Sequence, residues 1–201
     1  TGLGLTYKQG GLLWQDDIRE FIRPIAVFRF DFMHVYLQGG ICNHELDLLF
    51  QRLEEAGYTF GQMREYVTAK WGHPGWIKTD FGHSTMLNRS VEKHWREGDG
   101  LKMSASSLMC LQVVLVHALL TKIAPGGDLA RETECFDALQ EVLSLYIRAK
   151  RKGACGGQLR TAIRRHSRLH KAVYGVARWS PKHHWGIHLP DQVEADGELV
   201  D

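Results

Sequence analysis

The sequence is poor in the residues that build cross-linked or metal-clamped small scaffolds. It has four cysteines in 201 residues, widely spaced, with no C-x-x-C pair. Zinc ribbons and thiol redox motifs usually carry closely spaced cysteines, so neither class is indicated. We expect the four thiols to be reduced, as in an intracellular protein, and to serve as small buried hydrophobic residues.

Long apolar runs and common enzyme motifs are also missing. The longest apolar stretch, Leu108 to Leu120, is interrupted by Gln112 and His117. It is shorter than the ~20 residues that a helix needs to cross a bilayer, so we expect no membrane partner. The chain also lacks a P-loop, a dinucleotide fingerprint, a nucleophile elbow and a metalloprotease helix, which argues against those enzyme classes.

Acidic residues are absent from one long segment. Between Arg148 and Lys182 the chain holds eleven lysines or arginines and no aspartate or glutamate, although its net charge is only +2. A one-sided basic stretch of this length is a candidate phosphate-binding surface. The alternative is a solvated helix face without a ligand. Composition leaves both interpretations open.

Helical patterns dominate what is present. Apolar residues recur at helical spacing, and residues 104–123 are apolar almost all round, which is typical of a central buried helix. We expect helices over 12–21, 41–56, 62–70, 90–96, 104–123, 132–152 and 158–175. Only residues 25–30 have the composition of a buried strand. The sequence therefore predicts a mainly α fold with one short β-strand, too little to build a sheet.

The first motif is Asp31-Phe32-Met33-His34, directly after the predicted strand. Functional groups collect at strand ends in α/β folds, so Asp31 is a candidate ligand for a divalent cation and His34 a candidate phosphate donor or water-orienting group. The alternative is that Asp31 caps the following helix and His34 lies in its first turn.

The second motif occupies residues 181–190, P-K-H-H-W-G-I-H-L-P. Three interpretations are open: a hydrogen-bonded structural network, a zinc site that uses the i, i+4 pair His184 and His188 together with His183, and a set of phosphate-facing donors. The flanking prolines and Gly186 argue against a long helix here.

Together the two motifs resemble eukaryotic cut-and-paste transposases. Asp31 to His34 is similar to the D-x-M-H signature of the CACTA-like group, and Pro181 to Pro190 is similar to the P-K-x-H-x-x-x-H segment further along those proteins. The resemblance spans about residues 12–192. It implies the edge of an RNase H-like α/β core plus a helical insertion, double-stranded DNA as the partner, and a nuclear location.

The resemblance also implies three acidic residues that bind two Mg²⁺ or Mn²⁺ ions for DNA strand transfer. Asp16 or Asp17 is then a candidate for the second acid, with Asp31 and His34 beside the active site, and the choice between Asp17 and Asp31 as metal ligand stays open. We expect the first acid before Thr1 and the third after the last residue, so only a longer parent would be an enzyme.

On this interpretation the chain is a single-domain fragment. Residues 1–56 are the end of the core, 57–178 the insertion, 179–192 the histidine-rich return segment and 193–201 an irregular acidic tail. The residues expected at DNA are Lys182, His183, His184, His188, Arg164 and Arg165. The competing hypothesis is a non-catalytic helical interaction module, and either is compatible with a homo-oligomer.

Overall fold

Helices form almost all of the regular structure in this computed structural model. It describes residues 30–68, 86–123, 125, 127, 129–152 and 155–197, and within them no residue lies in a strand. The mainly α prediction is therefore confirmed for these residues, whereas no RNase H-like sheet is present among them. The predicted strand over 25–30, except its last residue, the predicted helix over 12–21 and the candidate ligand Asp17 lie outside the described residues.

The helices follow one another with short connections. In chain order they are the π-helix η2 (Met33–Leu37), α3 (Ile41–Glu55), α4 (Phe60–Thr68), α6 (Arg89–Arg96), α7 (Ala105–Ala118), the π-helix η4 (Leu119–Ile123), α8 (Ala130–Lys152), α9 (Gly156–Tyr174), the 3₁₀ helix η6 (Val176–Arg178), α10 (Pro181–Gly186) and α11 (Leu189–Asp196). The helices predicted within this part of the chain are present, with boundaries displaced by a few residues.

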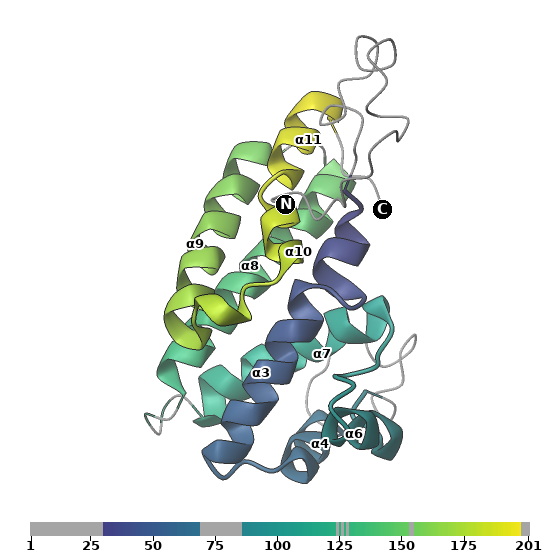
Figure 1. The fold of residues 1–201 in the computed structure, drawn as a ribbon, viewed down its shortest axis with the longest axis vertical. Coiled ribbons are helices and arrows are strands. Elements are labelled where there is room, and N and C mark those ends of the chain that lie inside the picture. Colours follow the sequence, from purple (N-terminus) through teal and green to yellow (C-terminus); the bar gives the residue numbers. More distant parts are fainter. Residues whose placement is uncertain are drawn as a thin grey trace, which may run out of the picture.

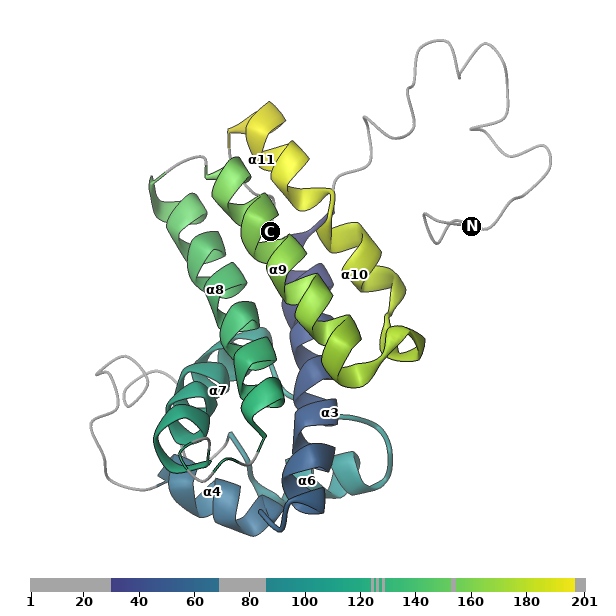
Figure 2. The ribbon, with the colours of Figure 1, turned by 90° about the vertical axis from the view of Figure 1, so that its left-hand side faces the viewer.

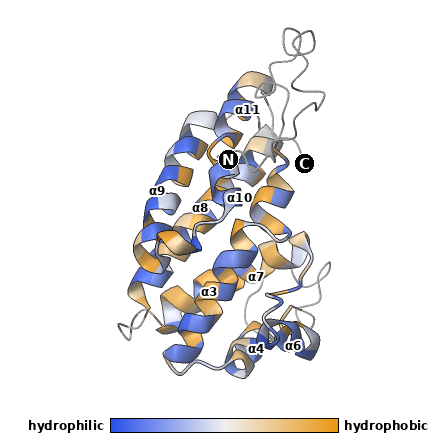
Figure 3. Ribbon diagram, in the orientation of Figure 1, coloured by the Kyte–Doolittle hydropathy of each residue, from blue (hydrophilic) through white to orange (hydrophobic). Residues whose placement is uncertain are grey.

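Three long helices form the body of the fold. In both ribbon views α3, α8 and α9 lie side by side, with α7 against α8 and α11 against α9 (Figures 1 and 2). The two short helices α4 and α6 gather at the end of the body opposite α11. Hydrophobic residues concentrate on the helix faces that meet one another, and hydrophilic residues on the outer faces (Figure 3). This is the arrangement expected of amphipathic helices around one core.

The core begins immediately at the first motif. The Phe32 ring is fully buried and stacks on Tyr146 of α8, with ring centroids 3.5 Å apart, and on Tyr36, with centroids 4.7 Å apart. Aromatic pairs of this kind add to the free energy gained by burial alone. Phe32 therefore anchors the segment that carries Asp31 and His34 to the C-terminal half of α8.

Helix α7 and its π-helical extension form the most apolar segment. Residues Ala105–Ile123 have a mean hydropathy of 1.6, and a helix of this length and composition could cross a membrane. In this fold half of it is buried against other helices, with Leu111 and Leu115 almost fully covered. The Thr121 hydroxyl donates to the His117 carbonyl at 2.7 Å. It competes with backbone N–H groups for that carbonyl where the α-helix changes to the wider π-helix.

Candidate functional site

Asp31 caps the helical turn that begins at Phe32, one residue before η2. Its Oδ1 accepts hydrogen bonds from the backbone N–H groups of Met33, at 2.7 Å, and His34, at 3.4 Å. The His34 imidazole forms a hydrogen bond through Nδ1 with the other carboxylate oxygen, Oδ2. This is the capping geometry that the sequence left open as an alternative to a metal ligand, and it satisfies N–H groups that a helix start leaves unpaired.

The electrostatic state of Asp31 follows from these contacts. Partial burial raises the pKa of its carboxyl group, but the hydrogen bonds from His34 and from the two backbone N–H groups outweigh it, so the pKa lies below the ordinary value. Asp31 is therefore a carboxylate at neutral pH. Its side chain is 34% exposed and that of His34 69%, so the pair is accessible from solvent.

The second motif folds into the short helix α10 and the start of the short helix α11, in agreement with the prediction that no long helix forms here. Pro181 stands at the start of α10, where its missing N–H costs nothing. Ser180 and His183 form a reciprocal cap, with the Ser180 hydroxyl 2.8 Å from His183 Nδ1. Helix α11 continues to Asp196, so part of the segment expected as an irregular tail is helical, and Gly197 ends it at φ +78°.

The fold brings the two motifs into direct contact, although more than 140 residues separate them. The Lys182 ammonium donates to the backbone carbonyl of His34 at 2.8 Å. The backbone N–H of Phe30 donates to Gln192 Oε1 at 2.8 Å, and Gln192 Nε2 donates back to the Phe30 carbonyl at 3.3 Å. The Phe30 ring stacks on His188, with centroids 5.7 Å apart. We call this contact between residues 30–34 and 182–192 the motif junction.

Beside the junction, the backbone of α10 packs closely against an aromatic ring of η2. A Cβ at Gly186 of α10 would lie 3.1 Å from the Tyr36 hydroxyl oxygen, so only glycine fits without a shift. Lys182 is half-buried there, and the loss of solvation lowers the pKa of its ammonium group from the ordinary value. His184 and His188 place their Nε2 atoms 3.5 Å apart on the partly exposed side of the same segment.

The basic residues of α9 divide into a paired and an unpaired set. At one edge of the helix Arg160 binds Asp191 and Glu194 of α11, each at 2.7 Å. At the other edge Arg165 binds Glu141 of α8 at 3.0 Å. These edge arginines hold α9 to its neighbours, so Arg165, a candidate DNA contact from the sequence, is occupied in an ion pair.

Between these edges runs a stripe of cations that we call the α9 basic stripe: Arg164, Arg168 and Lys171. Their spacing places them on one helix face, and all three are exposed. None forms an ion pair with a described residue, and the Lys171 ammonium lies 3.9 Å from the ring centroid of Trp179. An exposed row of cations without acidic partners is the arrangement that attracts a polyanion.

His183, expected at DNA, instead belongs to a buried polar cluster. It is only 2% exposed, and its ring lies 4.4 Å from that of His170, centroid to centroid. Burial and the nearby His170 lower its pKa to about 2, and burial lowers the pKa of His170 to about 4. Both rings are therefore neutral at physiological pH.

The centre of this cluster is a hydrogen-bonded pair between α3 and α9. Glu45 Oε2 lies 2.6 Å from His166 Nε2, and both side chains are essentially inaccessible to solvent. Burial raises the pKa of Glu45, but the His166 and His170 rings more than offset this, so its pKa lies below the ordinary value. Sequence reasoning missed these residues. The signal was His166-x-x-x-His170 on the apolar face of a helix.

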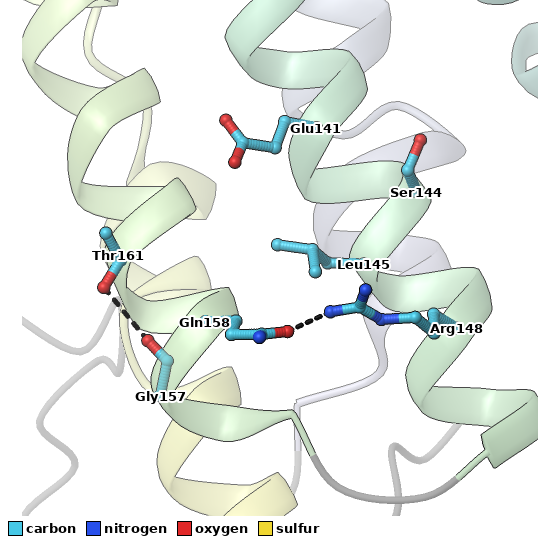
Figure 4. A pocket seen from close by; sticks show the side chains of 7 residues that line it. All are labelled: Glu141, Ser144, Leu145, Arg148, Gly157, Gln158 and Thr161. Atoms are coloured by element: carbon cyan, nitrogen blue, oxygen red, sulfur yellow. Dashed lines mark hydrogen bonds between the residues drawn. The ribbon is translucent and has the colours of Figure 1, made fainter.

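An open pocket lies between α8 and α9 on the outer surface (Figure 4). Its volume is about 660 Å³, and it is lined by Glu141, Ser144, Leu145, Arg148, Gly157, Gln158 and Thr161. Arg148 donates to the Gln158 side chain across it, and the Thr161 hydroxyl donates to the Gly157 carbonyl at 3.1 Å. None of the residues proposed from the motifs lines this pocket.

Comparison with known proteins gives no assignment. The chain matches no protein-family model, and no curated protein or solved structure is similar to it to a significant degree.

Proposed function

We propose that this chain is the helical, DNA-binding part of a transposase-like protein, and that the α9 basic stripe and the motif junction form its polyanion surface. The observation that carries the proposal is the charge arrangement on α9. Its edge arginines are neutralised by Glu141, Asp191 and Glu194, whereas Arg164, Arg168 and Lys171 are exposed and form no ion pair with any residue that the structure describes. Phosphate contacts from such residues supply most of the affinity of non-specific DNA binding.

The motif junction supports the same proposal independently. Lys182, His184 and His188 come from one segment and Asp31 and His34 from the other, and contacts such as the 2.8 Å Lys182–His34 hydrogen bond join the segments. In the transposase-like interpretation these side chains belong to one site, and the contact between the two segments supports this. His34, His184 and His188 keep exposed or partly exposed rings that can reach a phosphate. His183 and Arg165 are engaged elsewhere and are left out of the surface.

The RNase H-like core and its two metal ions remain part of the proposal only for a longer parent protein. Asp31 belongs to no group of three close ligand atoms among the described residues, and both of its oxygens already accept hydrogen bonds. The described part of the chain therefore does not fit a two-metal Mg²⁺ or Mn²⁺ site by itself. We assign to this part DNA binding and not strand transfer.

The direct test is equilibrium binding of the purified chain to a fluorescent duplex at low salt. Changing Arg164, Arg168 and Lys171 together to alanine removes the stripe but no described ion pair, so the fold should be retained. We expect the affinity to fall by a factor of ten or more, because each lost phosphate contact weakens binding.

The matched control removes the same charge at the other end of the molecule. Arg89, Lys93 and Lys102 lie on or near α6, and changing them to alanine should leave the affinity within about twofold. Equal losses of DNA affinity for both variants would show that net charge alone, and not the α9 basic stripe, determines binding. No binding by the unaltered chain at low salt would reject the DNA-binding proposal in favour of a helical interaction module.

A further inference from the structure

Ligand-type side chains from three helices meet in the core, beneath the proposed polyanion surface. Glu45 comes from α3, Cys135 from α8 and His166 from α9. One ligand atom from each lies within 4.8 Å of the other two, and all three residues are buried. Carboxylate, thiol and imidazole groups are rarely enclosed together unless something compensates for their polarity.

A fourth residue beside this group has an unexplained polar side chain. His170 follows His166 by one helical turn and is 0% exposed, and neither of its ring nitrogens has a hydrogen-bond partner within the described part of the chain. The His166 and His170 ring centroids are 6.0 Å apart. Two imidazoles on one tetrahedral zinc, with Zn–N bonds of about 2.0–2.1 Å, place their centroids roughly 5 Å apart. His170 is outside the close group of ligand atoms, so its ring must move toward the other three residues to become the fourth ligand.

We propose that Glu45, Cys135, His166 and His170 bind one divalent transition metal ion of the zinc class. The donor set of one carboxylate oxygen, one thiolate sulfur and two imidazole nitrogens suits Zn²⁺ and disfavours Mg²⁺ or Ca²⁺, which prefer oxygen ligands alone. The His-x-x-x-His spacing on α9 presents both rings on one helix face. Binding of the ion displaces the Cys135 thiol proton to solvent.

The burial of the site indicates a structural and not a catalytic ion. Each of the four side chains is at most 1% exposed, which leaves no open position for a substrate. The ion would tie α3, α8 and α9 together at one point. His183 lies beside these residues and is not one of the proposed ligands. Its Nδ1 is 2.8 Å from the Ser180 hydroxyl, and its ring packs on that of His170. This site is separate from the exposed pair His184 and His188.

The first test uses the unaltered chain, expressed without a histidine tag. We expect about one equivalent of zinc per chain by elemental analysis after dialysis. Replacement of zinc by Co²⁺ should give the visible bands of a tetrahedral ion and a thiolate-to-cobalt charge-transfer band in the near ultraviolet. A folded chain without stoichiometric metal, or a cobalt spectrum without the thiolate band, would overturn the proposal.

The second test locates the ion with paired variants. Cys135→Ser should abolish the charge-transfer band, and His170→Asn should lower the metal affinity at least tenfold. Cys155→Ser and His184→Asn are the matched controls outside the cluster and should change neither. Loss of metal in His184→Asn with retention in His170→Asn would place the ion at the exposed histidine pair and contradict the assignment. If a core variant fails to fold, the cobalt spectrum of the unaltered chain still decides whether a thiolate binds the ion.

Discussion

Asp31 caps a helical turn and also belongs to the surface that we propose as a polyanion site. Its carboxylate accepts hydrogen bonds from two backbone N–H groups and from the His34 ring. The next residue, Phe32, is buried in the core, where it stacks on Tyr146. The cap therefore fixes the direction in which His34 leaves the core. Any role of His34 at a phosphate depends on that direction.

Replacing Asp31 with alanine should lower the free energy of unfolding by about 1 kcal/mol at neutral pH, because the N–H groups of the first turn lose their acceptor. The pKa of Asp31 is depressed in the folded chain, so its stabilisation is present above the ordinary pKa of 3.8 and is lost as the pH falls through the folded value. Urea unfolding at several pH values should therefore show the difference shrinking in acid.

Asparagine at the same position is the matched control. It retains the capping oxygen, so Asp31→Asn should stay within a few tenths of a kcal/mol of the unaltered chain in the same titrations. Equal losses for alanine and asparagine would show that charge, and not capping, carries the contribution of Asp31.

Glu45 is the residue on which the buried cluster depends most. Removing one partner of a buried polar pair leaves the other uncompensated, so Glu45→Ala should cost about 3–5 kcal/mol of unfolding free energy. The comparison is Glu55→Ala on the same helix. Glu55 forms an ion pair with Arg52 but is 63% exposed, so its loss should cost less than about 1 kcal/mol. Urea unfolding in the presence of a chelator separates this effect from metal binding, and similar small losses for both variants would contradict the account.

At the scale of elements, the turn between η2 and α3 positions the motif junction. A Cβ at Gly40 would lie 2.5 Å from the carbonyl oxygen of Val35 and 2.5 Å from the carbonyl carbon of Tyr36. Backbone atoms cannot move aside as a flexible side chain can. The close approach therefore requires glycine and sets the angle at which α3 leaves the first motif.

Gly40→Ala should destabilise the chain by about 1–3 kcal/mol, because the turn must open to accept the methyl group. Gly157→Ala is the control on α9, where a Cβ would meet nothing within 4 Å. Alanine is the better helix former, so this change should be neutral or stabilise by up to about 1 kcal/mol. Thermal unfolding of both variants checks the pair, and a Gly40 variant as stable as the parent would refute the close-approach argument.

The helices were predictable because their signals are local. The apolar spacing of residues 41–56 and the breaks at Gly57 and at 153–157 are visible in the sequence, and α3, α8 and α9 follow them closely. The tail was predicted less well. Helix α11 extends past residue 193 because Val193 is buried in the core and Gln192 is bonded to Phe30, and neither contact has a local signal.

The candidate site was predictable only in part, for the same physical reason. The two motifs are related to each other in the sequence only through the family resemblance, and the structure places residues 30–34 in contact with residues 182–192. The cluster of Glu45, Cys135 and His166 draws on three helices far apart in the chain. Each member, taken alone, is an unremarkable residue within an amphipathic pattern, so only the packing of the helices reveals the group.

At the scale of the whole molecule, charge is uneven although the total is small. The net charge is +2, yet acidic residues pair with the arginines at the edges of α9, whereas no described acidic residue pairs with the cations on its exposed face. The fold therefore concentrates cations on one face while keeping the sum near neutrality. A molecule of this kind should bind a polyanion through that face. The salt dependence of its binding constant should scale with the small number of cations that contact phosphates.

The measurement that tests this most directly is the salt dependence of duplex DNA binding by the unaltered chain and by the Arg164/Arg168/Lys171 triple alanine variant. A plot of the logarithm of the binding constant against the logarithm of salt concentration has a slope of about −0.9 per neutralised phosphate. If the α9 basic stripe binds DNA, the slope is clearly negative for the unaltered chain and shallower by roughly 2 to 3 for the variant. Equal slopes for the two proteins, or no binding at low salt, would contradict this proposal.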